Sequence, residues 1–138
     1  MSEFRTLSGY DRQTERKLTR AMEDYLEMIC RHCKVQGYMR INQLAEQLHV
    51  KPSSSTKMAE QLKKQGYIEY EKYSYLKPTK KGWEMGDYLL RRHDILHRFL
   101  RIINNTSDEL EQVEQIEHFF DQRTIDNLEK WLERLQIP

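Results

Sequence analysis

No stretch of the 138-residue sequence approaches the roughly 18 consecutive apolar residues that a membrane-spanning helix needs. The opening residues, MSEFRTLSGYDRQTERK, also lack the apolar centre of a signal peptide. Cysteine is scarce, with two residues, which excludes a disulfide framework and a four-cysteine zinc site. These absences predict a cytoplasmic protein that has no contact with a membrane.

The two cysteines, Cys30 and Cys33, form a single C-x-x-C motif inside a helical pattern. A zinc site would need a second pair of ligands, and a redox site would place the motif where a strand leads into a helix. Neither condition is met in the sequence. We therefore expect both residues to be reduced structural thiols.

The net charge is only +1, but it is distributed unevenly along the chain. Residues 1–82 contain 16 Lys or Arg against 10 Asp or Glu, whereas residues 83–138 contain 7 against 12. A basic first part suits a polyanion such as nucleic acid, and an acidic second part suits cations.

Apolar residues recur at helical spacing from Thr14 to Gly37, from Lys80 to Ile103 and again from Thr124. Between the first two, residues 41–48 and a segment capped by Ser53 predict a helix-turn-helix, and the alternating stretch YIEYEKYSYLKPT predicts a two-stranded wing. The sequence therefore predicts a mainly α protein. Its parts are a mobile N-terminal arm (1–13), a winged helix-turn-helix DNA-binding domain (14–82) and a helical domain (83–138).

Small hydroxyl residues and lysines surround the start of the second helix of the helix-turn-helix. Such a helix start fits the major groove, where hydroxyls contact phosphates or base edges and lysines supply positive charge. The alternative is a structural helical hairpin with a solvated lysine face. The candidate DNA-binding residues are Lys51, Ser53, Ser54, Ser55, Thr56, Lys57, Lys63, Lys64, Lys72 and Lys77.

The stretch VEQIEHFF, residues 113–120, places Glu114, Glu117 and His118 at positions i, i+3 and i+4, which share one face of a helix. Taken alone, this pattern is also typical of a solvated acidic face. A second acidic pair, Asp24 and Glu27, has the same spacing on the first long helix.

Histidines supply further candidate ligands. His93 lies on the apolar stripe of the long helix, where it is either a core histidine or a ligand, and His97 is a rival or additional ligand one turn later. Together with these histidines, the two acidic motifs provide enough donors for two divalent cations. Four carboxylates would balance the charge of both cations.

Four segments in order, MEDYLEMI, KPSSSTKM, RRHDILHRFLRII and VEQIEHFF, resemble the diphtheria toxin repressor family, and within it the manganese-responsive regulators. The resemblance implies a winged helix-turn-helix domain followed by a helical metal-binding and dimerisation domain. It also implies a homodimer in which two metal ions per subunit activate binding to a near-palindromic double-stranded DNA operator of metal-uptake genes, which are thereby repressed.

Carried over by motif position, the resemblance assigns the metal ligands. Glu114 and Glu117 would bridge the two ions, Asp24 and His93 would complete one site, and Glu27 and His118 the other. Iron-responsive members of the family tend to have methionine at the position of Asp24, so the hard carboxylates here indicate Mn²⁺. Fe²⁺, Co²⁺ or Zn²⁺ could also bind in vitro.

Two other functions are compatible with parts of the sequence. One is a metal-independent winged-helix regulator that senses a small organic ligand. The other is a di-metal carboxylate enzyme, but the Glu-x-x-His spacing of such bundles and the common catalytic motifs are missing, so we expect no enzyme activity.

The apolar stripe Leu128, Trp131, Leu132 and Leu135 of the last helix predicts a dimer contact.

Overall fold

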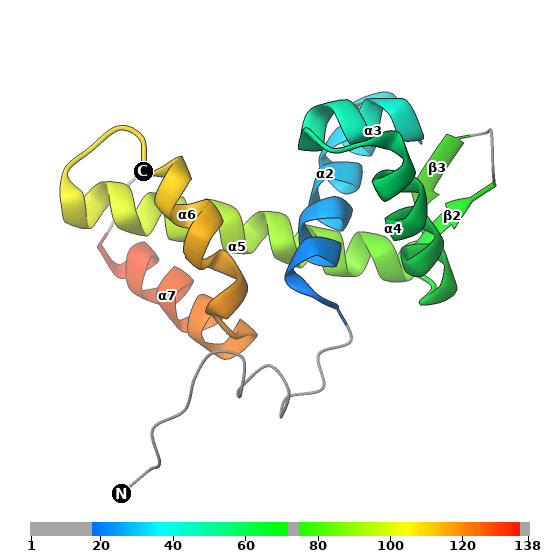
Figure 1. Ribbon diagram of the computed structural model, residues 1–138. Coiled ribbons are helices and arrows are strands. Elements are labelled where there is room, and N and C mark those ends of the chain that lie inside the picture. Colours follow the sequence, from blue (N-terminus) through cyan, green and yellow to red (C-terminus); the bar gives the residue numbers. More distant parts are fainter. Residues whose placement is uncertain (1–17, 72–74, 136–138) are drawn as a thin grey trace, which may run out of the picture.

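The structure, a computed structural model, describes residues 18–71 and 75–135, and its described part is mainly helical (Figure 1). The predicted N-terminal arm and Lys72 lie outside the described residues. The elements are α2 (Arg20–Gln36), β1 (Met39–Arg40), α3 (Ile41–Leu48), α4 (Pro52–Lys64), β2 (Ile68–Tyr70), β3 (Tyr75–Pro78), α5 (Lys80–Asn104), α6 (Leu110–Ile116), the 3₁₀ helix η1 (Glu117–Phe119) and α7 (Gln122–Arg134).

The first described helix begins later than the sequence pattern indicated. Thr19 has extended backbone and its hydroxyl accepts a hydrogen bond from the Met22 amide at 3.1 Å, so α2 starts at Arg20 rather than at Thr14. This side-chain cap satisfies one of the free amides of the first turn. The helix ends as predicted at Gly37, whose φ of 83° closes it in the left-handed conformation.

Helices α3 and α4 form the predicted helix-turn-helix. His49, with a φ of 57°, closes α3 in the left-handed conformation. Lys51 is the N-cap residue of α4 and Pro52 its first helical residue, so the predicted cap at Ser53 is wrong. Proline suits this position because the first amides of a helix have no partner within the helix.

The predicted wing is present and includes one strand that the sequence pattern did not indicate. Strands β2 and β3 pair antiparallel, with Glu69 opposite Lys77, and β1 pairs with the other edge of β3. At two residues, β1 is too short to show an alternating pattern. The wing is therefore a three-stranded sheet in the order β1-β3-β2.

Helix α5 runs the length of the described molecule and belongs to two hydrophobic cores (Figure 1). Its Leu89 packs with α2, α3, α4 and the sheet, while Ile95 and Leu96 pack with α6 and α7. Gly86 permits the close approach of α2, because a Cβ at this position would overlap Cys30 Sγ. The proposed domain boundary at residue 82 thus falls within a continuous helix that serves both cores.

Helix α7 presents only part of its apolar stripe at the surface. Ile125 and Leu132 are fully buried beneath it, whereas Trp131 and Leu135 remain 41% and 40% exposed.

Within the described residues, the structure contains no helix that combines the length and hydrophobicity of a membrane span.

Candidate metal centre and nucleic-acid interface

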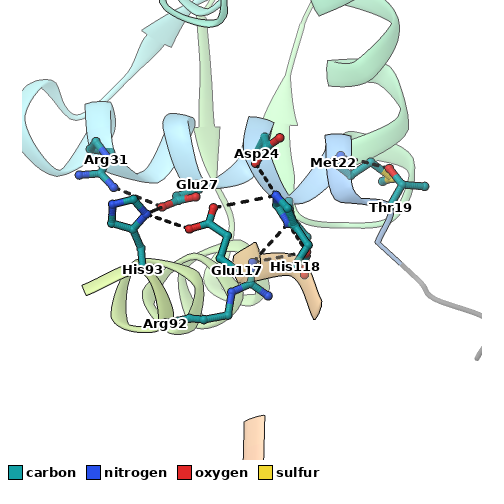
Figure 2. Close-up of polar contacts among 10 residues, drawn as sticks. Thr19, Met22, Asp24, Glu27, Arg31, Arg92, His93, Glu117 and His118 are labelled. Atoms are coloured by element: carbon teal, nitrogen blue, oxygen red, sulfur yellow. Dashed lines mark hydrogen bonds and ion pairs between the residues drawn. The ribbon is translucent and has the colours of Figure 1, made fainter. Parts of the chain in front are cut away.

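Three elements deliver acidic and histidine side chains to one place between the two cores (Figure 2). Helix α2 contributes Asp24 and Glu27, α5 contributes His93, and η1 contributes Glu117 and His118. In Figure 2, Glu117 lies between the two histidines. Five of the six predicted metal ligands therefore converge, from segments up to 94 residues apart in the sequence.

The first cluster consists of Glu27, His93 and Glu117, each of which has a ligand atom within 4.8 Å of the others. His93 Nδ1 lies 2.8 Å from Glu117 Oε2 and 3.7 Å from Glu27 Oε1. All three side chains are buried. This burial decides against a solvated acidic face for Glu117.

The buried position of this cluster changes its proton affinity. Burial, followed by the nearby charge of Glu117, raises the pKa of Glu27 to about 7. The hydrogen bond to Glu117 raises the pKa of His93 against the opposing effect of burial. Without a metal, protons and the Arg31 guanidinium, 3.2 Å from Glu27 Oε1, balance the negative charge.

The second cluster consists of Asp24, Glu117 and His118. His118 Nε2 lies 3.0 Å from Asp24 Oδ1 and 3.9 Å from Glu117 Oε1. Glu117 therefore turns one carboxylate oxygen towards each histidine, as a bridging ligand would. Burial opposes the charged form of His118, but its hydrogen bonds to Asp24 and Glu23 prevail and raise its pKa to about 9.

The structure groups the ligands differently from the arrangement that the family resemblance implied. Asp24 lies beside His118 and Glu27 beside His93, whereas the resemblance paired them the other way round. Glu114 is exposed and belongs to neither cluster, although it lines the same cavity of about 550 Å³ as Glu117. Helix α6 ends at Ile116, so Glu114 and the two residues of η1 do not share one α-helical face.

His97 also lies apart from both clusters. Its Nε2 accepts a hydrogen bond from the Glu109 amide at 3.1 Å, at the start of α6, and lies 3.7 Å from Asp108 Oδ1. The sequence Thr106-x-x-Glu109 suggests a capping box, but Glu109 is itself the N-cap residue of α6, and the Thr106 hydroxyl donates to the Glu109 carboxylate at 2.8 Å instead of accepting from its amide. His97 thus supports the loop between α5 and α6 in this structure.

The donor set fits a divalent cation. Glu27 and Glu117 are almost completely shielded from solvent, and buried carboxylates are costly unless a cation or hydrogen bonds compensate them. Carboxylate oxygens and imidazole nitrogens are ordinary ligands of Mn²⁺, Fe²⁺, Co²⁺ and Zn²⁺. The residues present can therefore hold such an ion.

Two residues at the centre were missed by sequence reasoning. Glu23 Oε1 lies 2.8 Å from His118 Nδ1, and Arg92 Nη2 lies 3.4 Å from the same oxygen. Glu23 adjoins Asp24, and Arg92 adjoins His93, so proximity to candidate ligands was the available signal. Their contact with each other depends on the packing of α2 against α5.

Helix α4 carries most of the predicted DNA-binding residues on its exposed surface. Thr56 donates its hydroxyl to the Pro52 carbonyl at 3.0 Å, and Lys77 on β3 lies 3.6 Å from Glu69 across the wing. Ser55 is fully buried, so the prediction that it contacts DNA is wrong. The exposed candidates are Lys51, Ser53, Ser54, Lys57, Lys63, Lys64 and Lys77.

Comparison with known protein families accounts for nearly the whole chain. Residues 17–76 match the iron dependent repressor N-terminal DNA binding domain, and residues 79–137 match the iron dependent repressor metal binding and dimerisation domain. The two matches adjoin one another at the start of α5.

Individual relatives give the same result. The chain is 42% identical to the HTH-type transcriptional regulator MntR of Oceanobacillus iheyensis, covering 80% of this chain and 76% of that protein. It is 44% and 43% identical to the proteins of that name from Listeria welshimeri and Bacillus subtilis, with 80% and 78% coverage in both cases.

Solved structures show the same fold. The chain superimposes on the metal-dependent transcriptional regulator MtsR with a TM-score of 0.71 and 27% identity, and on the manganese regulator SloR with 0.70 and 25%. Both superpositions cover 81% of this chain and 53% of the other, so the chain spans about half the length of these structures. The chain belongs to the iron-dependent repressor family, as a metal-dependent, DNA-binding transcriptional repressor with a C-terminal dimerisation domain.

Proposed function

We propose that the chain is a manganese-activated repressor that acts in the cytoplasm on an operator of metal-uptake genes. The observation that carries this proposal is the position of Glu117, which turns one oxygen towards each of two ligand clusters. The proposed ligands of two Mn²⁺ ions per subunit are Asp24, Glu27, His93, Glu114, Glu117 and His118.

The elements that provide these ligands explain how metal could control DNA binding. Asp24 and Glu27 lie on α2, which packs against α3 and α4 in the core of the DNA-binding part. Glu117 and His118 lie on η1, in the other part of the chain. A bound cation supplies the positive charge that these carboxylates lack. With that charge present, ligands from both parts can remain together, and the position of α4 becomes coupled to the metal centre.

Glu114 is proposed as a ligand that completes the centre from the rim of the cavity. It is exposed and extends from α6, one turn before Glu117. A carboxylate there can approach the clusters through a side-chain movement. Glu27 and Glu117, in contrast, are already buried at the centre.

The ligand chemistry supports manganese as the activating metal. Carboxylates outnumber imidazoles four to two in the proposed set, and hard oxygen ligands suit Mn²⁺. Zn²⁺ and Co²⁺ generally bind such sites more tightly than Mn²⁺ does, so affinity alone does not identify the activating metal. Two of the similar proteins are described as manganese or metal-dependent regulators, which agrees with this choice.

A panel of metals tests the proposal. Binding to operator or genomic fragments would be measured with Mn²⁺, Fe²⁺, Co²⁺, Zn²⁺ and without metal, at constant ionic strength. We expect tight binding with Mn²⁺ and binding weaker by at least about tenfold without metal, which is the lower range of allosteric coupling. Equal binding with and without metal would contradict the proposal and favour a regulator that senses an organic ligand.

The DNA interface is proposed to consist of the exposed start of α4 and the wing. In a homodimer, two such helices would face half-sites separated by about one helical turn of DNA or a multiple of it, which calls for a near-palindromic operator. Trp131 and Leu135, with the exposed Ile103 and Leu110, are candidates for the dimer contact.

Replacing Lys57 with alanine tests the position of α4 on DNA. Lys57 is exposed in the second turn of α4, where it can reach a phosphate. We expect weaker binding to every sequence and a salt dependence of log K shallower by about 1 unit, as for the loss of one phosphate contact. Ser55→Ala is the matched control, because Ser55 is buried in the same helix and its replacement should leave the affinity and its salt dependence unchanged. An unchanged salt dependence for Lys57→Ala would mean that α4 does not face the DNA backbone there.

A further inference from the structure

His118 is held from both sides of its ring by acidic residues of α2. Its Nε2 lies 3.0 Å from Asp24 Oδ1, on the side of the second ligand cluster, and its Nδ1 lies 2.8 Å from Glu23 Oε1. Glu23 is not a member of either cluster and is 15% exposed. Each ring nitrogen thus faces a different carboxylate. Nε2 faces the candidate ligand Asp24, and Nδ1 faces Glu23, which lies outside both clusters.

Arg92 supports Glu23 from α5. Its Nη2 lies 3.4 Å from Glu23 Oε1 and its side chain is 3% exposed, so this ion pair is shielded from solvent. Arg92 Nη2 is also 3.4 Å from His118 Nδ1. A guanidinium has only donors, and a protonated Nδ1 is a donor too, so both groups donate to the Glu23 carboxylate rather than to each other.

Both ring nitrogens of His118 face a carboxylate without a metal, but the two carboxylates differ once a metal takes the place of the Nε2 proton: Asp24 can then bind the metal, whereas Glu23 still faces Nδ1. A carboxylate such as Glu23 only accepts hydrogen bonds, which keeps the proton on Nδ1. Nε2 is then the nitrogen that can give its lone pair to a metal beside Asp24 and Glu117. Histidine ligands in metal sites commonly donate their second ring nitrogen to a carboxylate, and this contact fixes both the tautomer and the ring orientation.

We propose that Glu23, held in place by Arg92, is a positioning residue that accepts a hydrogen bond from Nδ1 of His118 and thereby directs Nε2 towards the metal. This inference rests on the proposed function, since it assigns a role in the same centre. Glu23 lies on α2, Arg92 on α5 and His118 on η1, so the three side chains also join the two parts of the chain at this point.

Metal affinity provides the first test. Mn²⁺ dissociation constants would be measured by chelator competition for the parent protein, Glu23→Ala, Glu23→Gln and the control Glu129→Gln. Glu129 lies on α7 and pairs with Arg91, next to Arg92 on α5, and it belongs to neither ligand cluster. After correction for proton competition at His118, we expect affinity to fall about 10- to 100-fold in Glu23→Ala, as for other contacts that orient a ligand. Glu23→Gln should lose less, because it retains an acceptor oxygen, and Glu129→Gln should match the parent.

A spectroscopic test separates positioning from a general loss of charge. Cd²⁺ would replace Mn²⁺ as a diamagnetic probe, and long-range ¹H–¹⁵N spectra would report the ring nitrogens of His118. The parent should show one form, with a proton on Nδ1 and cadmium on Nε2. Glu23→Ala should show more than one ring state or a rapidly exchanging Nδ1 proton, whereas Glu129→Gln should be unchanged.

Replacing Arg92 tests whether it affects the metal centre through Glu23. If Arg92 acts through Glu23, Arg92→Met should weaken Mn²⁺ binding in the parent but add little to the effect of Glu23→Ala. Additive losses would overturn the assigned role of Arg92. Should Glu23→Ala fold poorly by circular dichroism, Glu23→Gln carries the comparison, because its shape is nearly unchanged.

Two results distinguish this inference from the proposed function. Parent-like Mn²⁺ affinity and parent-like His118 spectra in the Glu23 variants would overturn the inference alone, as would cadmium bound to Nδ1. A parent protein that binds neither Mn²⁺ nor Cd²⁺ would overturn both.

Discussion

Glu117→Ala is expected to abolish Mn²⁺-dependent operator binding while the fold and the dimer persist. Glu117 is the only residue common to the two ligand clusters found among the described residues, so its loss removes a ligand from both. We expect Mn²⁺ affinity to fall by at least about 100-fold, the upper range for residues that merely orient ligands. Chelator competition would measure the affinity, and mobility of an operator probe would measure activation.

Two other glutamates on α6 serve as comparisons for Glu117→Ala. Glu111 is exposed in the first turn of α6, so Glu111→Ala removes the same charge outside the centre and should respond to Mn²⁺ like the parent. Glu114→Ala should have an intermediate effect, because Glu114 lies at the rim of the cavity. A parent-like response of Glu117→Ala would refute the metal-centre assignment.

The affinity for Mn²⁺ is expected to fall steeply as the pH is lowered. The acidic partners of His118 raise its pKa to about 9, and burial raises that of Glu27 to about 7. Ligands must be deprotonated to bind a metal, so binding releases the protons that these groups hold. Between pH 9 and 7, the proton on His118 should cost about tenfold in affinity per pH unit, and at lower pH the protons on Glu27 and His93 should make this loss steeper.

The affinity for Mn²⁺ falls at lower pH because the pKa values of Glu27 and His118 are both raised. Raised pKa values mean that the metal-free fold binds protons more tightly than free side chains do, so proton competition begins at a higher pH than for ordinary residues. Calorimetry in buffers of different ionisation enthalpy would count the released protons at each pH. An affinity that is constant from pH 6 to 9 would contradict these pKa shifts. Glu23→Gln should shift the steep region to lower pH, because Glu23 helps to hold the proton on His118 and is not one of the proposed ligands.

The fold could be predicted largely because its signals are local. Helical periodicity located α5 within one residue of its observed ends, and Gly37 marked the end of α2. The start of α2 was misplaced because the Thr19 hydroxyl caps the helix, so Leu18, the first apolar residue of the pattern, lies before the first helical residue. Strand β1 was missed because its two residues acquire their structure from pairing with β3.

The candidate site was predictable in its composition but not in its arrangement. Sequence motifs predicted six ligands, five of which lie together in the structure, but the choice of partners depends on how α2, α5 and η1 pack together. Glu23 and Glu27 show this difference, since they lie one turn apart on α2 and face different histidines. The break between α6 and η1 had no clear sequence signal.

Ser55 is a different case, because its burial had a signal in the sequence. It precedes Ala59 by four residues and Leu62 by seven, and all three face the core. The run of hydroxyl residues suggested that all of them are exposed to DNA, whereas helical periodicity places Ser55 on the buried face of α4. Periodicity is therefore the better guide to which residues of α4 can touch DNA.

Because α5 is one continuous helix, a tilt around a point near its middle would move its two ends in opposite directions. His93 lies near the middle of this 25-residue helix, with the wing attached before its first residue and the α5–α6 loop after its last. At a rise of about 1.5 Å per residue, each arm is roughly 18 Å long. A tilt of about 10° around His93 would displace the two ends by roughly 3 Å in opposite directions. A displacement of that size would be comparable to the spacing of about 3.4 Å between successive base pairs.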